Sequence, residues 1–125
     1  GGTVTGTGET LKEKLPGLYV AVVEPDGSPV LSGGQPGPHK LVGTSPGFVP
    51  AILNTSVYDE IVRVTDEDAL ETTRRLARLE GLLVGPSSGA SVWAALQIAR
   101  RLGPGKRVLC IAPDTGERYL SMGIF

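Results

Sequence analysis

Short, predominantly apolar segments alternate with helical patterns along this chain, and this alternation restricts the fold more than any other feature. The apolar segments cover residues 18–24, 61–64, 82–84 and 108–112. Because polar residues do not alternate regularly with the apolar ones, we expect strands that are buried on both faces. Strands of this kind, separated by helices, are typical of a parallel sheet. The sequence therefore predicts an α/β fold with a mostly parallel sheet flanked by helices.

Three segments between these strands have helical periodicity, over residues 4–14, 66–80 and 88–102. Thr65 is suited to cap the second helix, and Gly81 and Gly103 are suited to end the second and third. The first helix is expected to end at Pro16-Gly17. The third has its predicted apolar face on Val92, Ala95, Leu96, Ala99 and Leu102.

The composition is that of an ordinary globular protein. The chain has 125 residues, 40% of them hydrophobic and 20% charged, which fits one domain over 1–125. Twelve basic side chains against thirteen acidic ones give a net charge of -1, so nothing favours a nucleic-acid or membrane partner. A single cysteine and a single histidine exclude an internal disulfide and a zinc cluster. We expect a cytoplasmic protein.

Several residues with reactive or charged side chains are expected to have no catalytic role. His39 lies in the irregular stretch 26–50, and we expect an exposed loop histidine with no acidic or serine partner. Cys110 lies inside an apolar segment and is expected to be a small buried hydrophobic residue. Arg74, Arg75 and Arg78 are expected to form a solvated helix face. The long stretch 26–50 itself is expected to be functional or mobile, because such loops are uncommon in compact domains.

Three places combine polar or small residues with the carboxyl end of a strand or the start of a helix, where α/β folds bind ligands. Gly1-Gly2-Thr3 precede the first helix and form either a phosphate cradle or a tight turn. Ser87-Ser88-Gly89 start the third helix and supply either an N-cap or a ligand contact. Residues 113–119 follow the last strand and form either a turn with an exposed ion pair or one edge of a cofactor site. Each of these alternatives stays open on the residues alone.

Several long motifs resemble the C-terminal part of cysteine synthases (O-acetylserine sulfhydrylases), members of the tryptophan synthase β-like family of pyridoxal phosphate enzymes. The most specific pieces are "VEPDGSPVLSGGQPGPHKLVG", "GFVPAILNTSVYDEIVRVTDEDA", "GLLVGPSSGAS" and "PDTGERYLS". The resemblance covers essentially the whole chain. It implies the C-terminal portion of a fold-type II pyridoxal phosphate enzyme, so we expect this chain to be part of a longer protein.

The resemblance also implies roles for individual residues. Gly1, Gly2 and Thr3 match the end of the family's phosphate loop, and Ser87 matches the serine that hydrogen-bonds the pyridine nitrogen. A neutral serine at this place suits β-elimination and replacement. The residues implied to line the substrate side are Gly43, Ser45, Gly47 and Phe48. This chain has Gly-Thr-Ser-Pro-Gly where the family more often has Gly-Ile-Gly-Ala-Gly, so we expect Ser45 to narrow the pocket and Pro46 to stiffen the loop.

The family's Schiff-base lysine has no counterpart in this sequence, and neither does its substrate-carboxylate loop. The four lysines present do not stand in the matching context; they are Lys12, Lys14, Lys40 and Lys106. We therefore expect a half-site that is inactive by itself and is completed by an N-terminal portion, on the same polypeptide or on a separate chain.

The implied reaction converts O-acetylserine and sulfide to cysteine and acetate, with a homodimer and serine acetyltransferase as expected partners. Cystathionine β-synthase and O-phosphoserine sulfhydrylase activities remain alternatives within this class. Two other classes also remain: a non-catalytic ligand-binding half-fold, and a nucleotide-binding domain that uses Gly1–Thr3. The second of these lacks a Walker lysine and an acidic ribose partner.

Overall fold

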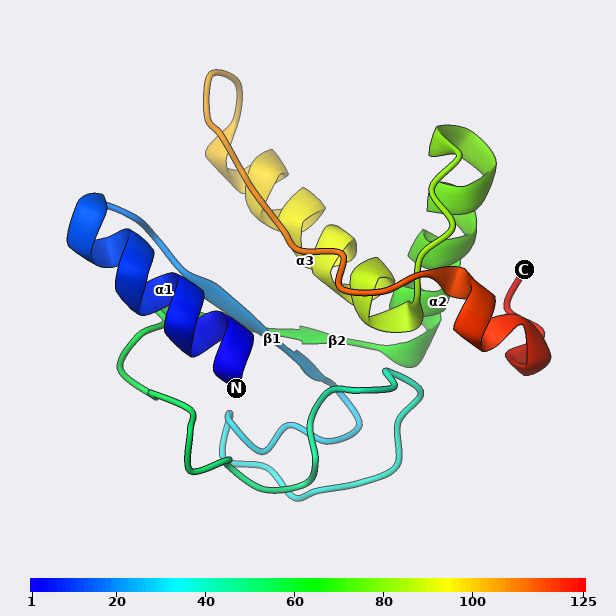
Figure 1. Cartoon of the computed structure of the whole chain (residues 1–125), viewed down its shortest axis with the longest axis horizontal. Coiled ribbons are helices and arrows are strands. Elements are labelled where there is room, and N and C mark those ends of the chain that lie inside the picture. The colour runs from blue at the N-terminus through cyan, green and yellow to red at the C-terminus, as the bar shows by residue number, and fades with distance from the viewer.

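The computed structural model describes all residues from 1 to 125, which form helices around a small parallel sheet (Figure 1). The elements in chain order are the helix α1 (Gly2–Lys14), the strands β1 (Ala21–Pro25) and β2 (Glu60–Val64), and the helices α2 (Asp66–Arg75) and α3 (Pro86–Leu102). A π-helical turn, Leu76–Glu80, continues α2, and a 3₁₀ helix, Gly116–Met122, lies near the C-terminus.

The two strands pair in parallel, with Val22 opposite Ile61 and Val23 opposite Val62. One further backbone hydrogen bond of 2.8 Å, from Asp26 N–H to the Val64 carbonyl, extends the pairing past the end of β1. A parallel pair needs a long crossover, and residues 26–59 provide it as an irregular loop on one side of the molecule (Figure 1). The predicted α/β class with parallel strands is confirmed.

The sheet is smaller than the sequence predicts, because two expected strands do not form. Residues 82–84 make only a single antiparallel bridge, between Val84 and Thr115. Residues 108–112 run back along α3 without strand pairing, and Leu109 is 84% exposed there (Figure 1). A β-strand needs a neighbour to satisfy its backbone groups, and no other strand of this chain lies beside 108–112. The apolar pattern at these positions is typical of a strand, but the pairing partner is absent.

The core is small and lies where α3 packs against both α2 and the sheet. Its fully buried apolar residues are Leu41, Val64, Ala69, Ala90 and Ala94, with Val23, Val62 and Trp93 packed against them. The alanines allow the two helices to approach closely. The closest approach is at Gly89, where a Cβ would collide with the Ala69 carbonyl and the Thr73 hydroxyl.

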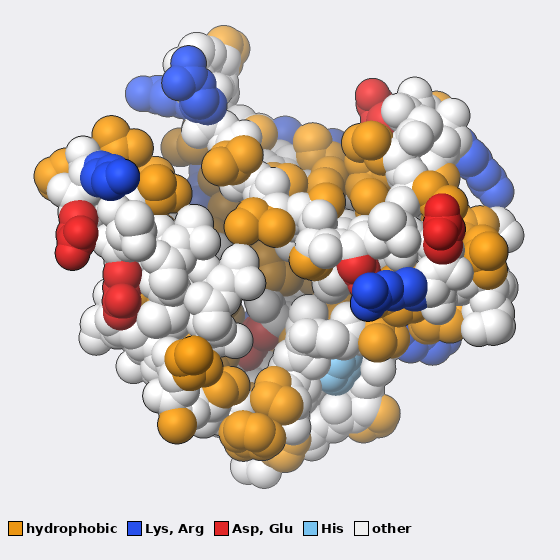
Figure 2. Space-filling model, viewed as in Figure 1, with side chains coloured by type: hydrophobic (Ala, Val, Ile, Leu, Met, Phe, Trp, Pro, Cys, Tyr) orange, Lys and Arg blue, Asp and Glu red, His pale blue; other side chains and the backbone are white.

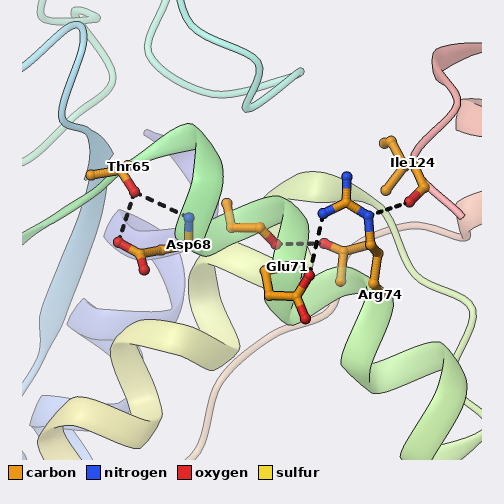
Figure 3. A network of polar contacts seen from close by, with 7 residues as sticks. Thr65, Asp68, Glu71, Arg74 and Ile124 are labelled. Atoms are coloured by element: carbon orange, nitrogen blue, oxygen red, sulfur yellow. Dashed lines mark hydrogen bonds and ion pairs between the residues drawn. The ribbon is translucent and has the colours of Figure 1, made fainter.

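The predicted ends of α2 are confirmed, and Figure 3 shows the polar contacts along it. The Thr65 hydroxyl accepts a 3.1 Å hydrogen bond from Asp68 N–H and so caps the helix. Gly81 ends the π-helical turn with a φ of 68°, in the left-handed region that glycine tolerates. Arg75 and Arg78 are exposed, as expected, but Arg74 is half-buried. Its Nε donates a 2.6 Å hydrogen bond to the Ile124 carbonyl, which ties the C-terminal segment to α2.

The predicted apolar face of α3 is only partly buried. The residues that pack against α2 and the sheet are small and include Ser88, Gly89, Ala90 and Ala94. Leu96 and Leu102, expected to be in the core, are 42% and 46% exposed. The two leucines lie on different sides of α3: Leu96 borders a shallow groove beside Leu76 and Leu79, whereas Leu102 lies on the side that faces β1 and residues 106–111. No helix of the structure is both long enough and apolar enough to span a lipid bilayer.

We expect Gly89→Ala to lower the free energy of unfolding by about 1–3 kcal/mol, because the added methyl group separates α2 from α3. Gly6→Ala is the matched control, since Gly6 lies in α1 and a methyl group added there would meet no other part of the chain within 4 Å. Alanine is the better helix former, so the control should gain up to about 1 kcal/mol. Urea denaturation of both variants measures the difference, and equal effects would contradict close packing at Gly89.

Candidate cofactor-binding site

A large cleft opens between α1, β1 and α3, and we call it the central cleft. Its volume is about 1440 Å³, and the loop 41–50 and the segment 106–113 complete its walls. Figure 2 shows the molecule hollowed on this face, with hydrophobic side chains around the opening. The cleft is larger than a typical small-molecule pocket, which measures roughly 300–1,000 Å³. It therefore has room for a cofactor together with other protein segments.

The N-terminus of α1 lies at this cleft. Gly1 is the N-cap, no side chain caps the helix, and the Gly1 carbonyl accepts a 3.1 Å hydrogen bond from Thr5 N–H. The N–H groups of the first turn therefore have no partner within the helix. Gly1, Gly2 and Thr3 are exposed and line the cleft. Free donors at the positive end of a helix dipole fit a phosphate group.

The N-terminus of α3 lies on the same cleft and also has no side-chain cap. The helix begins at Pro86 with Gly85 as its N-cap, so the interpretation of a serine as the capping residue is wrong. Ser87 is half-buried and lines the cleft, whereas Ser88 is fully buried and its hydroxyl has no hydrogen-bond partner. The two adjacent serines therefore differ: only the Ser87 hydroxyl is available to a ligand in the cleft.

Asp114 and Tyr119 pack against the turn that precedes Ser87. The Tyr119 hydroxyl donates a hydrogen bond to one Asp114 carboxylate oxygen, and both side chains pack on Gly85 so closely that a Cβ there would collide with them. The other Asp114 oxygen is buried without a partner. The predicted turn with an exposed ion pair is therefore wrong for residues 113–119. These residues instead fix the start of α3, and among them Pro113 lines the cleft.

Glu24 fixes the beginning of the loop that forms the opposite wall. It is 2% exposed, and its carboxylate accepts hydrogen bonds from Leu31 N–H at 2.8 Å, Ser32 N–H at 3.0 Å and the Ser32 hydroxyl. Charge-assisted bonds of this kind are strong inside a protein. The role of Glu24 is not among the predictions from the sequence, although a carboxylate at the end of an apolar strand was a usable signal.

The four residues predicted to line the substrate side do not all reach the cleft. Gly43, Ser45 and Phe48 line it, but Gly47 lies outside the lining and faces Pro36. Gly43, Ser45 and Gly47 all have φ in the left-handed region, at 85°, 44° and 89°. Three of the five positions from 43 to 47 therefore have a backbone conformation that favours glycine.

The structure corrects two expectations about reactive side chains. His39 is half-buried, and its Nε2 donates a 3.1 Å hydrogen bond to the Ser45 carbonyl, so it is not a free loop histidine. Cys110 is exposed because its strand does not pair. Desolvation by neighbouring apolar atoms raises the pKa of the Cys110 thiol, which keeps it protonated at neutral pH. The Cys110 thiol is therefore a poor nucleophile despite its exposure.

The lysines lie mostly away from the cleft. Lys12 forms a 2.9 Å ion pair with Asp59, which contributes to lowering the pKa of that carboxyl. Lys14 and Lys40 are exposed and do not line the cleft, whereas Lys106 is exposed at its rim. No group of three or more histidine, cysteine or acidic residues is arranged to hold a metal ion.

The model of one protein family, described as pyridoxal-phosphate dependent enzymes, matches residues 1–114. The chain belongs to this family. A probable cysteine synthase of Bacillus subtilis is 66% identical over the whole chain. The solved O-acetyl serine sulfhydrylase isoform 3 of Entamoeba histolytica is 42% identical over 98% of the chain, with a TM-score of 0.94. An O-acetylserine dependent cystathionine beta-synthase of Helicobacter pylori is 46% identical over 98%, with a TM-score of 0.92.

The chain is shorter than these members of the family. It spans 40% of the length of the Bacillus subtilis relative, and 37% and 40% of the two solved structures. These proteins confirm the fold-type II pyridoxal phosphate fold and the resemblance to cysteine synthases. The roles of individual residues remain predictions from the sequence and the geometry.

We expect Tyr119→Phe to lower the free energy of unfolding by about 0.5–1.5 kcal/mol at neutral pH, through the lost hydrogen bond to Asp114. That bond, with desolvation second, raises the pKa of Tyr119 above its ordinary value of 10.0. The stabilisation is therefore complete below pH 10 and is lost as the pH rises through the folded-state pKa. Urea denaturation at pH 7 and above pH 11 measures this. A difference between wild type and Tyr119→Phe that does not shrink at high pH would contradict it.

Proposed function

We propose that this chain forms the phosphate and pyridine-nitrogen half of a pyridoxal phosphate site in a cysteine synthase. The complete enzyme would convert O-acetylserine and sulfide to cysteine and acetate. The observation that carries the proposal is that two uncapped helix N-termini, α1 at Gly1–Thr3 and α3 at Ser87, line one cleft although more than eighty residues of chain separate them.

The residues present fit this cofactor chemically. A phosphate carries negative charge, and the first turn of α1 offers free backbone donors, a helix dipole and the Thr3 hydroxyl at one end of the cleft. A ring nitrogen needs one polar group, and Ser87 offers a single neutral hydroxyl from a helix whose start is fixed by Asp114 and Tyr119. The apolar walls suit the flat ring between these ends.

Pyridoxal phosphate, when bound, supplies an electron sink for bond cleavage next to the amino-acid nitrogen. The residues of this chain would bind and orient it: Gly1–Thr3 hold the phosphate and Ser87 hydrogen-bonds the ring nitrogen. A serine hydroxyl is neutral and does not stabilise a protonated nitrogen as a carboxylate would. This electronic setting suits β-replacement of a leaving group such as acetate.

The rest of the site would come from residues outside this sequence. None of the four lysines stands where the family's Schiff-base lysine is expected, so the chain by itself should be inactive. The uncovered apolar walls support this, because Leu102 and Leu109 are 46% and 84% exposed around a cleft larger than one cofactor needs. Apolar surface of this extent is usually covered by other protein segments. A homodimer and serine acetyltransferase remain partners that only the resemblance suggests.

Cystathionine β-synthase activity is the second candidate function. The Helicobacter pylori protein described as an O-acetylserine dependent cystathionine beta-synthase is as similar in structure as the sulfhydrylase, with TM-scores of 0.92 and 0.94. The two activities differ in the nucleophile that replaces the leaving group. Assays of the complete protein with sulfide or homocysteine as nucleophile separate them, and O-phosphoserine in place of O-acetylserine tests the third alternative.

The first test measures cofactor binding and turnover in the complete protein and in the isolated chain. We expect a visible absorbance band from covalently bound pyridoxal phosphate, together with cysteine formation from O-acetylserine and sulfide, in the complete protein only. A complete protein that shows neither would instead support a non-catalytic ligand-binding half-fold. Activity of the isolated chain would contradict the half-site.

We expect Ser87→Ala to weaken pyridoxal phosphate binding by the complete protein about 2- to 12-fold, the effect of one neutral hydrogen bond. Ser88→Ala is the matched control, because the neighbouring hydroxyl is buried and has no partner. Its removal should leave cofactor affinity unchanged. Equilibrium dialysis of the cofactor, with stability measured in parallel, distinguishes the two. Equal affinities for wild type and Ser87→Ala would contradict the role of Ser87.

A further inference from the structure

Ser45 has a backbone conformation that serine rarely adopts. It is the one non-glycine residue in the chain with positive φ, at 44°, and it lies in the cleft-lining segment 43–48. An L-residue in the left-handed region is strained, and such strain persists only where surrounding contacts hold the residue in place. The contacts of Ser45 therefore show what holds it in this conformation.

The hydroxyl and the backbone carbonyl of Ser45 both form hydrogen bonds with earlier residues of the loop. The Ser45 hydroxyl donates a 3.1 Å hydrogen bond to the Ser28 carbonyl and lies 3.4 Å from the Ser28 hydroxyl oxygen. The Ser45 carbonyl accepts a 3.1 Å hydrogen bond from His39 Nε2. The Ser45 side chain is thus directed at Ser28, although Ser45 also borders the cleft.

Ser28, the partner of the Ser45 hydroxyl, lies in a buried and closely packed turn. Ser28 is 1% exposed, and its hydroxyl also accepts a 3.3 Å hydrogen bond from Gly37 N–H. Gly27 and Gly37 touch backbone to backbone, since a Cβ on Gly27 would lie 2.8 Å from the Pro38 carbonyl oxygen and one on Gly37 would collide with Gly27. The turn is joined directly to β1, where Glu24 fixes residues 31 and 32. Ser45 is therefore hydrogen-bonded to a buried, closely packed turn that directly follows β1.

We propose that Ser45 is a positioning residue that holds the segment 43–48 in the shape that receives the amino-acid substrate, through its bonds to Ser28 and His39. This inference rests on the proposed function, in which the substrate binds against that segment. Ordering the segment before the substrate arrives raises apparent affinity, because a site that is only partly in its competent shape binds more weakly in proportion. The hydroxyl acts on the loop and makes no bond to the substrate.

The test compares three substitutions in the complete holoenzyme, with O-acetylserine as the varied substrate. Ser45→Ala removes the hydroxyl and keeps the strain, so the segment should leave its position part of the time. We expect the KM for O-acetylserine to rise about 2- to 10-fold while kcat changes less than about twofold, since the lost interaction is uniform between ground state and transition state. Ser45→Gly should also raise the KM, and it folds without strain because glycine tolerates this φ.

Ser45→Asn should restore much of the affinity. Asparagine adopts the left-handed region more readily than other residues with a side chain, and its amide N–H group can donate to the Ser28 carbonyl. Ser56→Ala is the matched control, because Ser56 lies in an exposed loop and its hydroxyl makes no hydrogen bond. It should change neither KM nor kcat.

Amide hydrogen exchange provides a readout that does not depend on turnover. Residues 43–48 should exchange about 2- to 10-fold faster in Ser45→Ala and Ser45→Gly than in wild type or Ser56→Ala. If Ser45→Ala and Ser45→Gly both have the exchange rates and the KM of wild type, the proposal is overturned. A fall in kcat at constant KM would also overturn it, because it would indicate direct contact with reacting groups.

The failure of the proposed function is distinguishable from the failure of this inference. If the wild-type protein binds no cofactor and forms no product, the proposed function fails, yet faster exchange in Ser45→Ala would still support the positioning of the segment by Ser45. If wild type is active and the variants match it in exchange and KM, only the inference about Ser45 fails.

Discussion

The close contact between α2 and α3 at Gly89 is the constraint on which the arrangement of the site depends. Gly89 lies two residues after Ser87, and it meets the Ala69 carbonyl and the Thr73 hydroxyl with no space for a side chain. This contact sets the depth and the direction of the start of α3. Asp114 and Tyr119 fix the same turn from the other side through Gly85. The Ser87 hydroxyl is therefore positioned by packing on two sides, before any ligand binds.

The cleft has two walls that are built differently. On the α3 side, small residues and close helix packing determine the geometry. On the loop side, no regular secondary structure is present, and hydrogen bonds to Glu24, Ser28 and Ser45 hold the backbone in place. A helix N-terminus offers free backbone N–H donors to a ligand, whereas the loop determines the shape of the cleft wall. The proposed site for a cofactor and an amino-acid substrate would use both, and they come from separate segments of the chain.

The elements that the sequence predicted well are those set by local chemistry. The Thr65 cap and the left-handed Gly81 follow from short-range hydrogen bonds and backbone sterics, so they could be predicted from a few residues. Local chemistry could not show whether residues 108–112 form a strand, because a strand also needs a neighbouring strand to pair with. No strand of this chain pairs with 108–112. The same dependence made Cys110 exposed and not buried. The contacts of Glu24 and His39 depend on how the irregular loop folds, which residue patterns do not specify.

The two-stranded sheet has a consequence for the behaviour of the chain on its own. β1 and β2 pair only with each other, so each strand has an outer edge with unpaired backbone donors and acceptors. Such edges are templates for adding strands from any chain, including another copy of this one. Leu109, 84% exposed in the unpaired segment 108–112, adds further uncovered apolar surface. Synthesised alone, the polypeptide is therefore exposed to intermolecular aggregation through these edges.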